Sequence, residues 1–379
     1  MKNLYYLPLL ALLLACGKNS EKQTDYSQLS FSVDTVMVDS KEEILYLKSQ
    51  LSTAVLSENR DLLYNFNNDL HSLEIIDLDN LVFLDRAVFE REGPDGTGNY
   101  IQNAHLLDDE NLLLNTFQKS GVFSKKGQKS RDLNLRYTDY AGEVPQGGET
   151  LSSPLIFKSF PHYMIGTFND YMFNSLFLGK LDLEKKSFDK KNLPEFGYLK
   201  EFFVQQIGEN GYPIAIISPM IYREIAGNKI ILGNTVSSDV YVYDLEKDSL
   251  SFHMIPHSLF PDRKTKNYPS KVESREQFME VNQQFGSEIN FKKPLWDEDK
   301  QVYYRFAHYN IWKEVDGKMG SPGAEVYLAV MDQDFKVLSE SKLDLLEKAP
   351  QFYFLKDGKI WIFTNINDEM AFVRLSIQH

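Results

Sequence analysis

His253 and His257 have the spacing that places two imidazoles on one face of a helix, as in many zinc sites. Pro256 lies between them, and a proline inside a helix removes a hydrogen bond and clashes with the preceding turn. No glutamate or third ligand adjoins the pair. His71, His162 and His253 are also evenly spaced, but they stand before a strand, in a turn and at the end of a hairpin. Equivalent positions of a repeat would share one context, so the sequence predicts no metal site and no cofactor.

Acidic residues cluster in two predicted turns, Asp108–Glu110 and Asp297–Asp299. A calcium loop needs alternating oxygen ligands around a glycine bend, and neither cluster has this pattern. We therefore interpret both clusters as solvated turns. Carboxylate pairs for glycoside hydrolysis converge from distant positions, so that chemistry stays open. The chain contains no Gly-x-Ser-x-Gly or His-Glu-x-x-His motif, and the sequence identifies no catalytic residue.

A further set combines residue types that make good polar contacts in binding sites. We expect Arg91 and Glu92 to lie in a solvated turn and Tyr304 and Trp312 to be core, because buried aromatics are common. The alternative is that these groups contact a ligand at the mouth of the fold, and the ligand-binding residues stay unassigned. The full set is Arg91, Glu92, Tyr304, Arg305, His308 and Trp312.

Four turn-forming residues lie close together in the stretch Phe89–Gly98. Gly93 and Gly98 have the spacing of a phosphate-cradling loop. However, Asn99 and Tyr100 stand where that motif needs lysine and serine or threonine. We expect a tight turn here and no bound nucleotide.

A hairpin pattern recurs along the chain and must position any site. In Asp239–Phe252, alternating apolar residues lead into a polar turn centred on Asp244, and apolar alternation resumes at Leu250. Similar hairpins are expected at Leu178–Phe188, Glu74–Phe83 and Val326–Leu338. Repeated antiparallel hairpins predict an all-β propeller of six or seven four-stranded blades. Two face-packed sandwiches are the alternative.

Other segments complete this prediction. We expect Leu29–Val38 to pair with Ala371–Ile377 in one blade, because a sealed blade leaves no free edges. Ser274–Phe285 has helical periodicity, whereas Lys41–Leu51 is expected to form a short strand or one helical turn. Glu195–Pro213 is expected to connect blades. Asp357-Gly358 is a strong hairpin signal.

The only cysteine, Cys16, follows an apolar run, Leu4–Leu14, that is too short to span a bilayer. The sequence Leu13-Leu-Ala-Cys16 resembles the lipobox of bacterial lipoproteins, which implies cleavage before Cys16 and its acylation, for example with palmitate. An ordinary export leader is the alternative. We expect a lipoprotein signal peptide at 1–15, a flexible tether at 16–28 and a propeller domain at 29–379.

Several loose motifs carry a family resemblance. Glu90–Gly98, Leu112–Thr116 and Gly121–Gly127 resemble the repeat of six-bladed β-propeller lipoproteins from Bacteroidota. Tyr303–Phe306 and Met331–Glu340 are similar to a subgroup of those lipoproteins that carries a domain of unknown function. The resemblance implies an envelope location and a propeller fold, and it implies no catalytic residue.

The formal net charge is −13, without a basic block, which argues against binding of nucleic acid. We expect a monomeric protein anchored by lipid at Cys16 to the outer membrane, facing the periplasm or the exterior. The expected function is a binding or scaffold module for a glycan, peptide or protein. The alternative is a hydrolase or lyase with its active site in the propeller channel, and the sequence favours no enzymatic activity.

Overall fold

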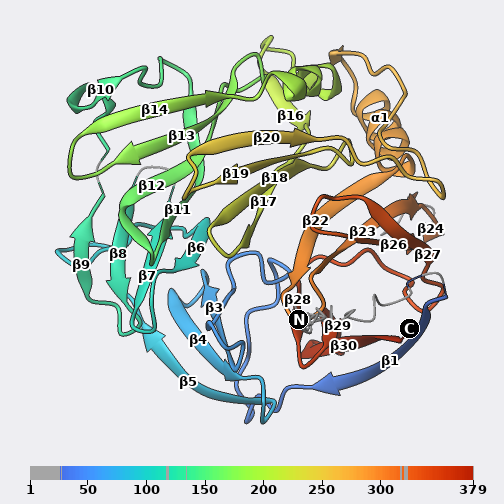
Figure 1. Cartoon of the computed structure of the whole chain (residues 1–379), viewed down its shortest axis with the longest axis horizontal. Helices are drawn as coiled ribbons and strands as arrows, with labels where there is room; N and C mark the ends of the chain where they lie inside the picture. Colours follow the sequence, from blue (N-terminus) through green and yellow to red (C-terminus); the bar gives the residue numbers. More distant parts are fainter. Residues whose placement is uncertain are drawn as a thin grey trace, which may run out of the picture.

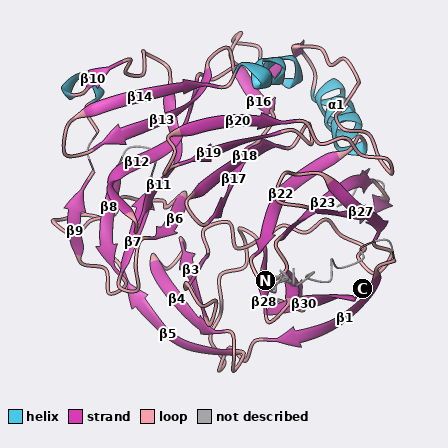
Figure 2. Ribbon diagram, viewed as in Figure 1, coloured by secondary structure: helices cyan, strands magenta, loops and turns pink. Residues whose placement is uncertain are grey.

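The computed structural model describes residues 26, 28–116, 119–133, 135–315, 318–319 and 323–378. Within these residues the chain consists mainly of β-strands, which confirms the predicted all-β class (Figure 2). The predicted signal peptide and Cys16 lie outside the described residues. Tyr26, near the end of the predicted tether, is buried and packs in a core cluster with Leu295 and Tyr304.

Five sheets of the described chain have four strands each. They are β2–β5 (Val55–Leu56, Leu62–Asn67, Ser72–Asp77, Val82–Val88), β6–β9 (Asn103–Leu106, Asn111–Asn115, Ser120–Ser124, Lys129–Asp132), β17–β20 (Ile221–Ala226, Lys229–Asn234, Val240–Asp244, Ser249–His253), β22, β23, β26 and β27 (Asn290–Asp297, Val302–Ile311, Gly323–Met331, Val337–Lys342), and β28, β29, β30 and β1 (Tyr353–Lys356, Lys359–Ile366, Glu369–Gln378, Ser30–Met37).

A five-stranded, a three-stranded and a two-stranded sheet complete the strands of the described chain. They are β11–β14 with β10 (Thr150–Phe157, Phe160–Asn169, Leu176–Asp182, Ser187–Asn192, Ala141–Gly142), β15, β16 and β21 (Val204–Ile207, Pro213–Ile217, Lys271–Val272), and β24 and β25 (Glu314–Val315, Lys318–Met319). The helices are α1 (Arg275–Ser287) and two 3₁₀ helices, Tyr137–Asp139 and Pro194–Phe202.

The larger sheets follow one another around the molecule in chain order (Figure 1). The first and last strands share one sheet, because β1 pairs antiparallel with β30. Ser30 lies opposite Gln378 and Met37 opposite Ala371. The predicted pairing of the chain's two ends is therefore confirmed.

Hydrophobic clusters fill the spaces between neighbouring sheets. Each central strand is covered on both faces, so strands such as Lys229–Asn234 are buried along almost their whole length. One cluster joins the last sheet to the first, with Phe354 and Phe372 packing beside Ile76 and Phe83. The core is thus divided among the sheet interfaces and does not form one central mass.

The predicted Asp-centred hairpins are confirmed, and the aspartate explains their recurrence. In the β19–β20 turn, the Asp244 carboxylate accepts the backbone N–H groups of Glu246 and Lys247, both at 3.1 Å. Asp182 and Asp77 make the equivalent contacts in two other hairpins, and Asp332 accepts the N–H groups of Asp334 and Lys336 in a longer turn. A short carboxylate that satisfies turn N–H groups is a common reason for aspartate at this position.

Two further local predictions are confirmed. Helix α1 begins after Ser274, whose hydroxyl accepts the Gln277 N–H in a capping box, and the helix buries Val281 and Phe285. Asp357 and Gly358 both have positive φ, 51° and 70°, as a two-residue hairpin turn requires.

The expectation for Lys41–Leu51 is wrong, because this segment forms turns and contains neither strand nor helix. A buried carboxylate on β4 accepts the Tyr46 backbone N–H, so the segment satisfies part of its backbone through a side chain. The stretch Glu195–Pro213 is more than a connection. It contributes most of a 3₁₀ helix and, through β15 and the start of β16, joins a separate small sheet.

Candidate functional site

A cavity of about 490 Å³ lies where six sheets meet, and each sheet contributes one strand to its wall. These strands are β2, β6, β11, β17, β22 and β28. Each is an edge strand of its sheet, and β6, β17 and β22 run toward the middle of the view in Figure 1. Edge strands present unpaired backbone N–H and C=O groups, and the volume matches pockets that hold small ligands.

The alternation of β17 places its charged side chains on opposite faces of the strand. Ile221 and Ile225 pack against the cluster beside the β11–β14 sheet, and Arg223 shares their face by its position in the strand. Tyr222 and Glu224 take the other face, where they contact residues of the sheet that contains β22. An arginine and a glutamate adjacent in sequence therefore face two different neighbouring sheets.

On the second face, an ion pair joins β17 to β22. Glu224 Oε2 lies 2.7 Å from Lys293 Nζ, and both side chains are partly buried. The Lys293 carbonyl accepts a 2.6 Å hydrogen bond from the Tyr353 hydroxyl of β28. Burial, with the Glu224 charge adding to it, raises the pKa of Tyr353 well above its ordinary value. Three sheets are thus connected by polar contacts at the cavity wall.

Arg223 makes no such connection. Its side chain reaches the cavity, its Nη1 is shielded from solvent, and Nη1 has no hydrogen-bond partner among the described residues. Burial lowers the pKa of Arg223 to about 9. A guanidinium in this position is a charged donor without an acceptor, which is costly in a folded protein.

His105 on β6 lines the same cavity. Its Nε2 lies 3.1 Å from the Ile156 carbonyl of β11, and because a carbonyl only accepts, Nε2 carries the proton. Burial, reinforced by the charge of Arg223, lowers the pKa of His105 to about 4. The imidazole is therefore neutral near pH 7.

Most of the other charged side chains of the cavity have partners, whereas the exposed Asp109 makes no side-chain contact with a described residue. Lys158 lies 3.3 Å from Glu58, and Arg60 Nη1 donates to the Leu355 carbonyl at 2.6 Å. Asp108 accepts the backbone N–H groups of Glu110 and Asn111 within its own turn. The cavity thus combines paired charges, one neutral imidazole, the exposed carboxylate of Asp109 and an unpaired guanidinium, and this guanidinium is the group suited to holding an anion.

The histidines whose spacing in the sequence suggested a metal site do not lie together in the structure. His71 Nε2 contacts the Thr97 hydroxyl at 2.6 Å, His162 lies against Tyr163, and His253 contacts the Ser251 hydroxyl at 2.9 Å. His257 is buried, and its Nδ1 lies 2.6 Å from Glu340. Within the described ranges, no three His, Cys, Asp or Glu side chains are grouped as a metal ion would require.

The two acidic clusters lie in turns, where their first aspartate has a structural role. Asp297 accepts the Lys300 backbone N–H at 3.0 Å, as Asp108 does in its turn. Asp108 and Asp109 also lie on the wall of the cavity, which their sequence context did not indicate.

The six polar and aromatic candidates do not form one surface. Arg91 is exposed and donates to the Asn99 carbonyl at 2.8 Å, and Glu92 is exposed in the same turn. Tyr304 is buried in the core as expected, whereas Trp312 is only partly buried. The remaining two residues, Arg305 and His308, are buried.

The Gly93–Gly98 turn is held by side chains of this chain. Asp95 accepts the Lys129 backbone N–H at 2.9 Å, and the Thr97 hydroxyl contacts both His71 and the Glu90 carbonyl. The polar residues of the turn therefore stabilise the turn itself.

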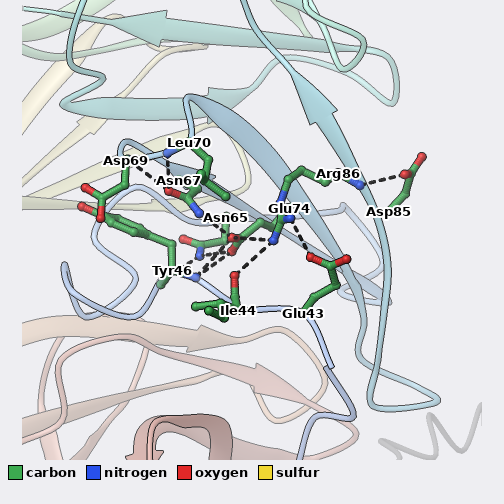
Figure 3. Close-up of polar contacts among 10 residues, drawn as sticks. All are labelled: Glu43, Ile44, Tyr46, Asn65, Asn67, Asp69, Leu70, Glu74, Asp85 and Arg86. Atoms are coloured by element: carbon green, nitrogen blue, oxygen red, sulfur yellow. Dashed lines mark hydrogen bonds and ion pairs between the residues drawn. The ribbon is translucent and has the colours of Figure 1, made fainter. Parts of the chain in front are cut away.

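A second buried polar cluster surrounds Glu74 on β4 (Figure 3). Its carboxylate accepts N–H groups from the Tyr46 backbone at 3.1 and 3.2 Å, from Asn65 at 2.9 Å and from Asn67 at 2.8 Å. Burial raises the pKa of Glu74, although these hydrogen bonds oppose the rise. The carboxylate is saturated by the chain itself, so the cluster is a structural clamp on residues 41–51.

Sequence analysis did not single out His105, Arg223, Glu224 or Lys293. One signal was available, because Arg223 and Glu224 interrupt an otherwise apolar strand, Ile221–Ala226. Two adjacent charges inside such a strand must find polar surroundings on both faces. In the described part of the chain, no helix is long and apolar enough to cross a membrane.

Comparisons with known proteins give a family and a fold. The family model for the "Domain of unknown function (DUF4221)" matches residues 26–342. The chain is similar to the crystal structure of a member of that family from Bacteroides vulgatus, with 15% identity, 93% of this chain and 99% of the other covered, and a TM-score of 0.65.

A second similar structure is a "Putative exported protein" from Bacteroides fragilis, with 10% identity, 92% of this chain and 96% of the other covered, and a TM-score of 0.51. Identities this low show the fold alone. No curated protein matches the chain.

Proposed function

The chain therefore belongs to the DUF4221 domain family, and from this premise we propose that it is a six-bladed β-propeller that binds a ligand in the cavity at its axis. The observation that carries this proposal is the cavity wall, to which six sheets contribute one edge strand each.

Six blades are favoured over seven by the same wall. The three-stranded sheet of β15, β16 and β21 contributes no residue to the cavity, and we interpret it as an insertion between the third and fourth blades. The cluster that joins Phe354 and Phe372 to Ile76 and Phe83 supports closure of the last blade onto the first. Pairing of β1 with β30 also supports closure, because the first strand of the described chain completes the last blade.

Binding is favoured over catalysis by the state of the cavity's charged groups. Glu224 is held in an ion pair with Lys293, and Glu58 lies beside Lys158. Neither is a free carboxylate of the kind that general acid–base chemistry uses.

Asp108 accepts N–H groups of its own turn, so Asp109 is the carboxylate of this wall without a partner among the described residues. It lacks the second carboxylate that a paired mechanism needs. A concave space with a few placed polar groups is typical of sites that hold a ligand.

For location, we propose an exported lipoprotein anchored through Cys16 to the outer membrane and facing the periplasm or the exterior. The leader sequence and the lipobox resemblance support this proposal. The similar Bacteroides fragilis protein, described as exported, is consistent with it.

A screen of the protein on glycan and peptide arrays tests the binding function. The matched variant Ala54→Trp places a large side chain at the cavity wall, and Lys348→Gln changes an exposed residue outside the cavity. We expect hits that wild type and Lys348→Gln share and that Ala54→Trp loses while keeping its melting temperature. Hits that all three proteins retain would place binding elsewhere, and chemical conversion of a hit would favour a hydrolase or lyase.

A further inference from the structure

We propose that Arg223 binds the anionic group of the ligand, so that the cavity takes a small molecule or chain end carrying a carboxylate, phosphate or sulfate. This inference rests on the proposed function, because both concern the same cavity. It adds the chemical class of the ligand and the residue that recognises it.

The unpaired guanidinium is the first observation. Arg223 lies on β17 and lines the cavity, its Nη1 has no hydrogen-bond partner, and its guanidinium forms no ion pair with a described residue. Guanidinium groups bind oxyanions through two parallel N–H donors, which fits carboxylate, phosphate and sulfate alike.

A fully buried arginine elsewhere in the same chain provides an internal comparison for the partly buried Arg223. Arg305 is 1% exposed and donates to the carbonyls of Lys292, at 3.0 Å, and Ser237, at 3.3 Å. It also donates to the Ser238 carbonyl and to the Tyr222 hydroxyl. The fold thus satisfies the guanidinium that has a structural role and leaves unsatisfied the one that faces the cavity.

The neighbouring charges leave room for an anion. Glu224, next to Arg223 in sequence, lies on the opposite face of β17 and pairs with Lys293 at 2.7 Å. The nearby His105 donates from Nε2 to the Ile156 carbonyl and is neutral. It therefore does not repel the Arg223 guanidinium, and it carries no negative charge that would take the place of a ligand anion. Since no protein carboxylate neutralises Arg223, a ligand anion is the group that can do so.

The cavity limits the size of this ligand. Its volume of about 490 Å³ is within the range of small-molecule sites, and because the cavity opens to solvent it can also admit the end of a longer chain. A uronic acid, a peptide carboxyl terminus or a small phosphate ester satisfies both the size and the charge. The overall charge of −13 opposes anions at long range, so recognition has to come from the contact itself.

The test is calorimetric titration of the full chain in detergent with sodium glucuronate, inorganic phosphate and sodium sulfate. We expect at least one probe to bind wild type, and Arg223→Gln to weaken that binding about 10- to 100-fold, as loss of charge-assisted hydrogen bonds implies. Arg131→Gln changes an exposed arginine on β9 and should bind like wild type. Which probe binds distinguishes a carboxylate site from a phosphate or sulfate site.

Absence of binding by all three probes, or equal binding by wild type and Arg223→Gln, would overturn the inference. If Arg223→Gln does not fold, Arg223→Lys decides, because lysine keeps the charge and loses the planar donor pair. Glucuronate binding at least about threefold weaker in Arg223→Lys supports the inference, and unchanged binding contradicts it. Array hits that Ala54→Trp loses and Arg223→Gln keeps would contradict this inference alone and leave the proposed function intact.

Discussion

The guanidinium of Arg305 on β23 donates to the hydroxyl of Tyr222 on β17, and this contact joins two neighbouring sheets. Gly233 on β18, opposite Tyr222 in register, has no side chain, and a Cβ there would collide with the Tyr222 ring. Tyr222 immediately precedes Arg223. One strand therefore positions an acceptor for a structural arginine and carries the arginine that faces the cavity.

This contrast predicts opposite effects of the same substitution. Arg305→Met leaves the Ser238 and Lys292 carbonyls without their donor and should destabilise the protein by about 3–5 kcal/mol. Arg223→Met removes a partly buried, unpaired charge and should stabilise the ligand-free protein by about 1–3 kcal/mol. Urea denaturation of the three proteins measures both effects. Destabilisation by Arg223→Met would show that the guanidinium has structural partners.

The Glu74 cluster predicts that removing the charge of this one carboxylate lowers the free energy of unfolding. Every orientation of the amide in Glu74→Gln turns an NH₂ group toward N–H donors of Tyr46 and of Asn65 or Asn67. We expect a loss of about 2–3 kcal/mol and faster hydrogen exchange at the Tyr46 amide. The control is Glu58→Gln, which removes an exposed ion pair to Lys158 outside the cluster and should cost less than about 1 kcal/mol. Equal effects of the two variants would contradict the clamp.

Two histidines with lowered pKa values, His105 and His308, predict instability in acid. The pKa of His105 is lowered to about 4, by burial and by Arg223, and that of His308 to about 3, by burial and then by Lys292 and Lys264. Between these values and the ordinary 6.5, the unfolded state binds more protons than the folded state. Stability therefore falls as the pH drops below about 6.5, and the contribution of His105 is fully lost below about 4.

His105→Gln should remove its part of this loss, about 2 kcal/mol at pH 5. Thermal melting at pH 7 and pH 5 compares it with wild type and with His162→Gln, which changes a partly exposed histidine. A pH dependence in His105→Gln as steep as in wild type would show that the imidazole is not held neutral.

The predicted lipid anchor has a direct test in cells. Wild type should incorporate labelled palmitate and sediment with membranes, because two or more acyl chains anchor a protein stably. Cys16→Ser should lose the label and become soluble. Membrane association of Cys16→Ser together with an unlabelled wild type would contradict acylation.

The sequence by itself determined the local elements, because strand alternation, capping and turn chemistry act over a few residues. The Asp244 turn, the Ser274 cap and Asp357-Gly358 are where their residue types predicted. Pairing of the two ends followed from the need to cover free strand edges, and the register of β1 with β30 confirms it.

The cavity was decided by the tertiary structure. His105, Arg223 and Lys293 come from three strands far apart in sequence, and they share a wall because edge strands of different sheets meet there. Strand periodicity tells which side chains share a face, but not which neighbour that face meets. The same limit explains why the helical spacing of residues 41–51 did not produce a helix. The Tyr46 backbone N–H is bound instead by Glu74, which lies on a strand further along the sequence.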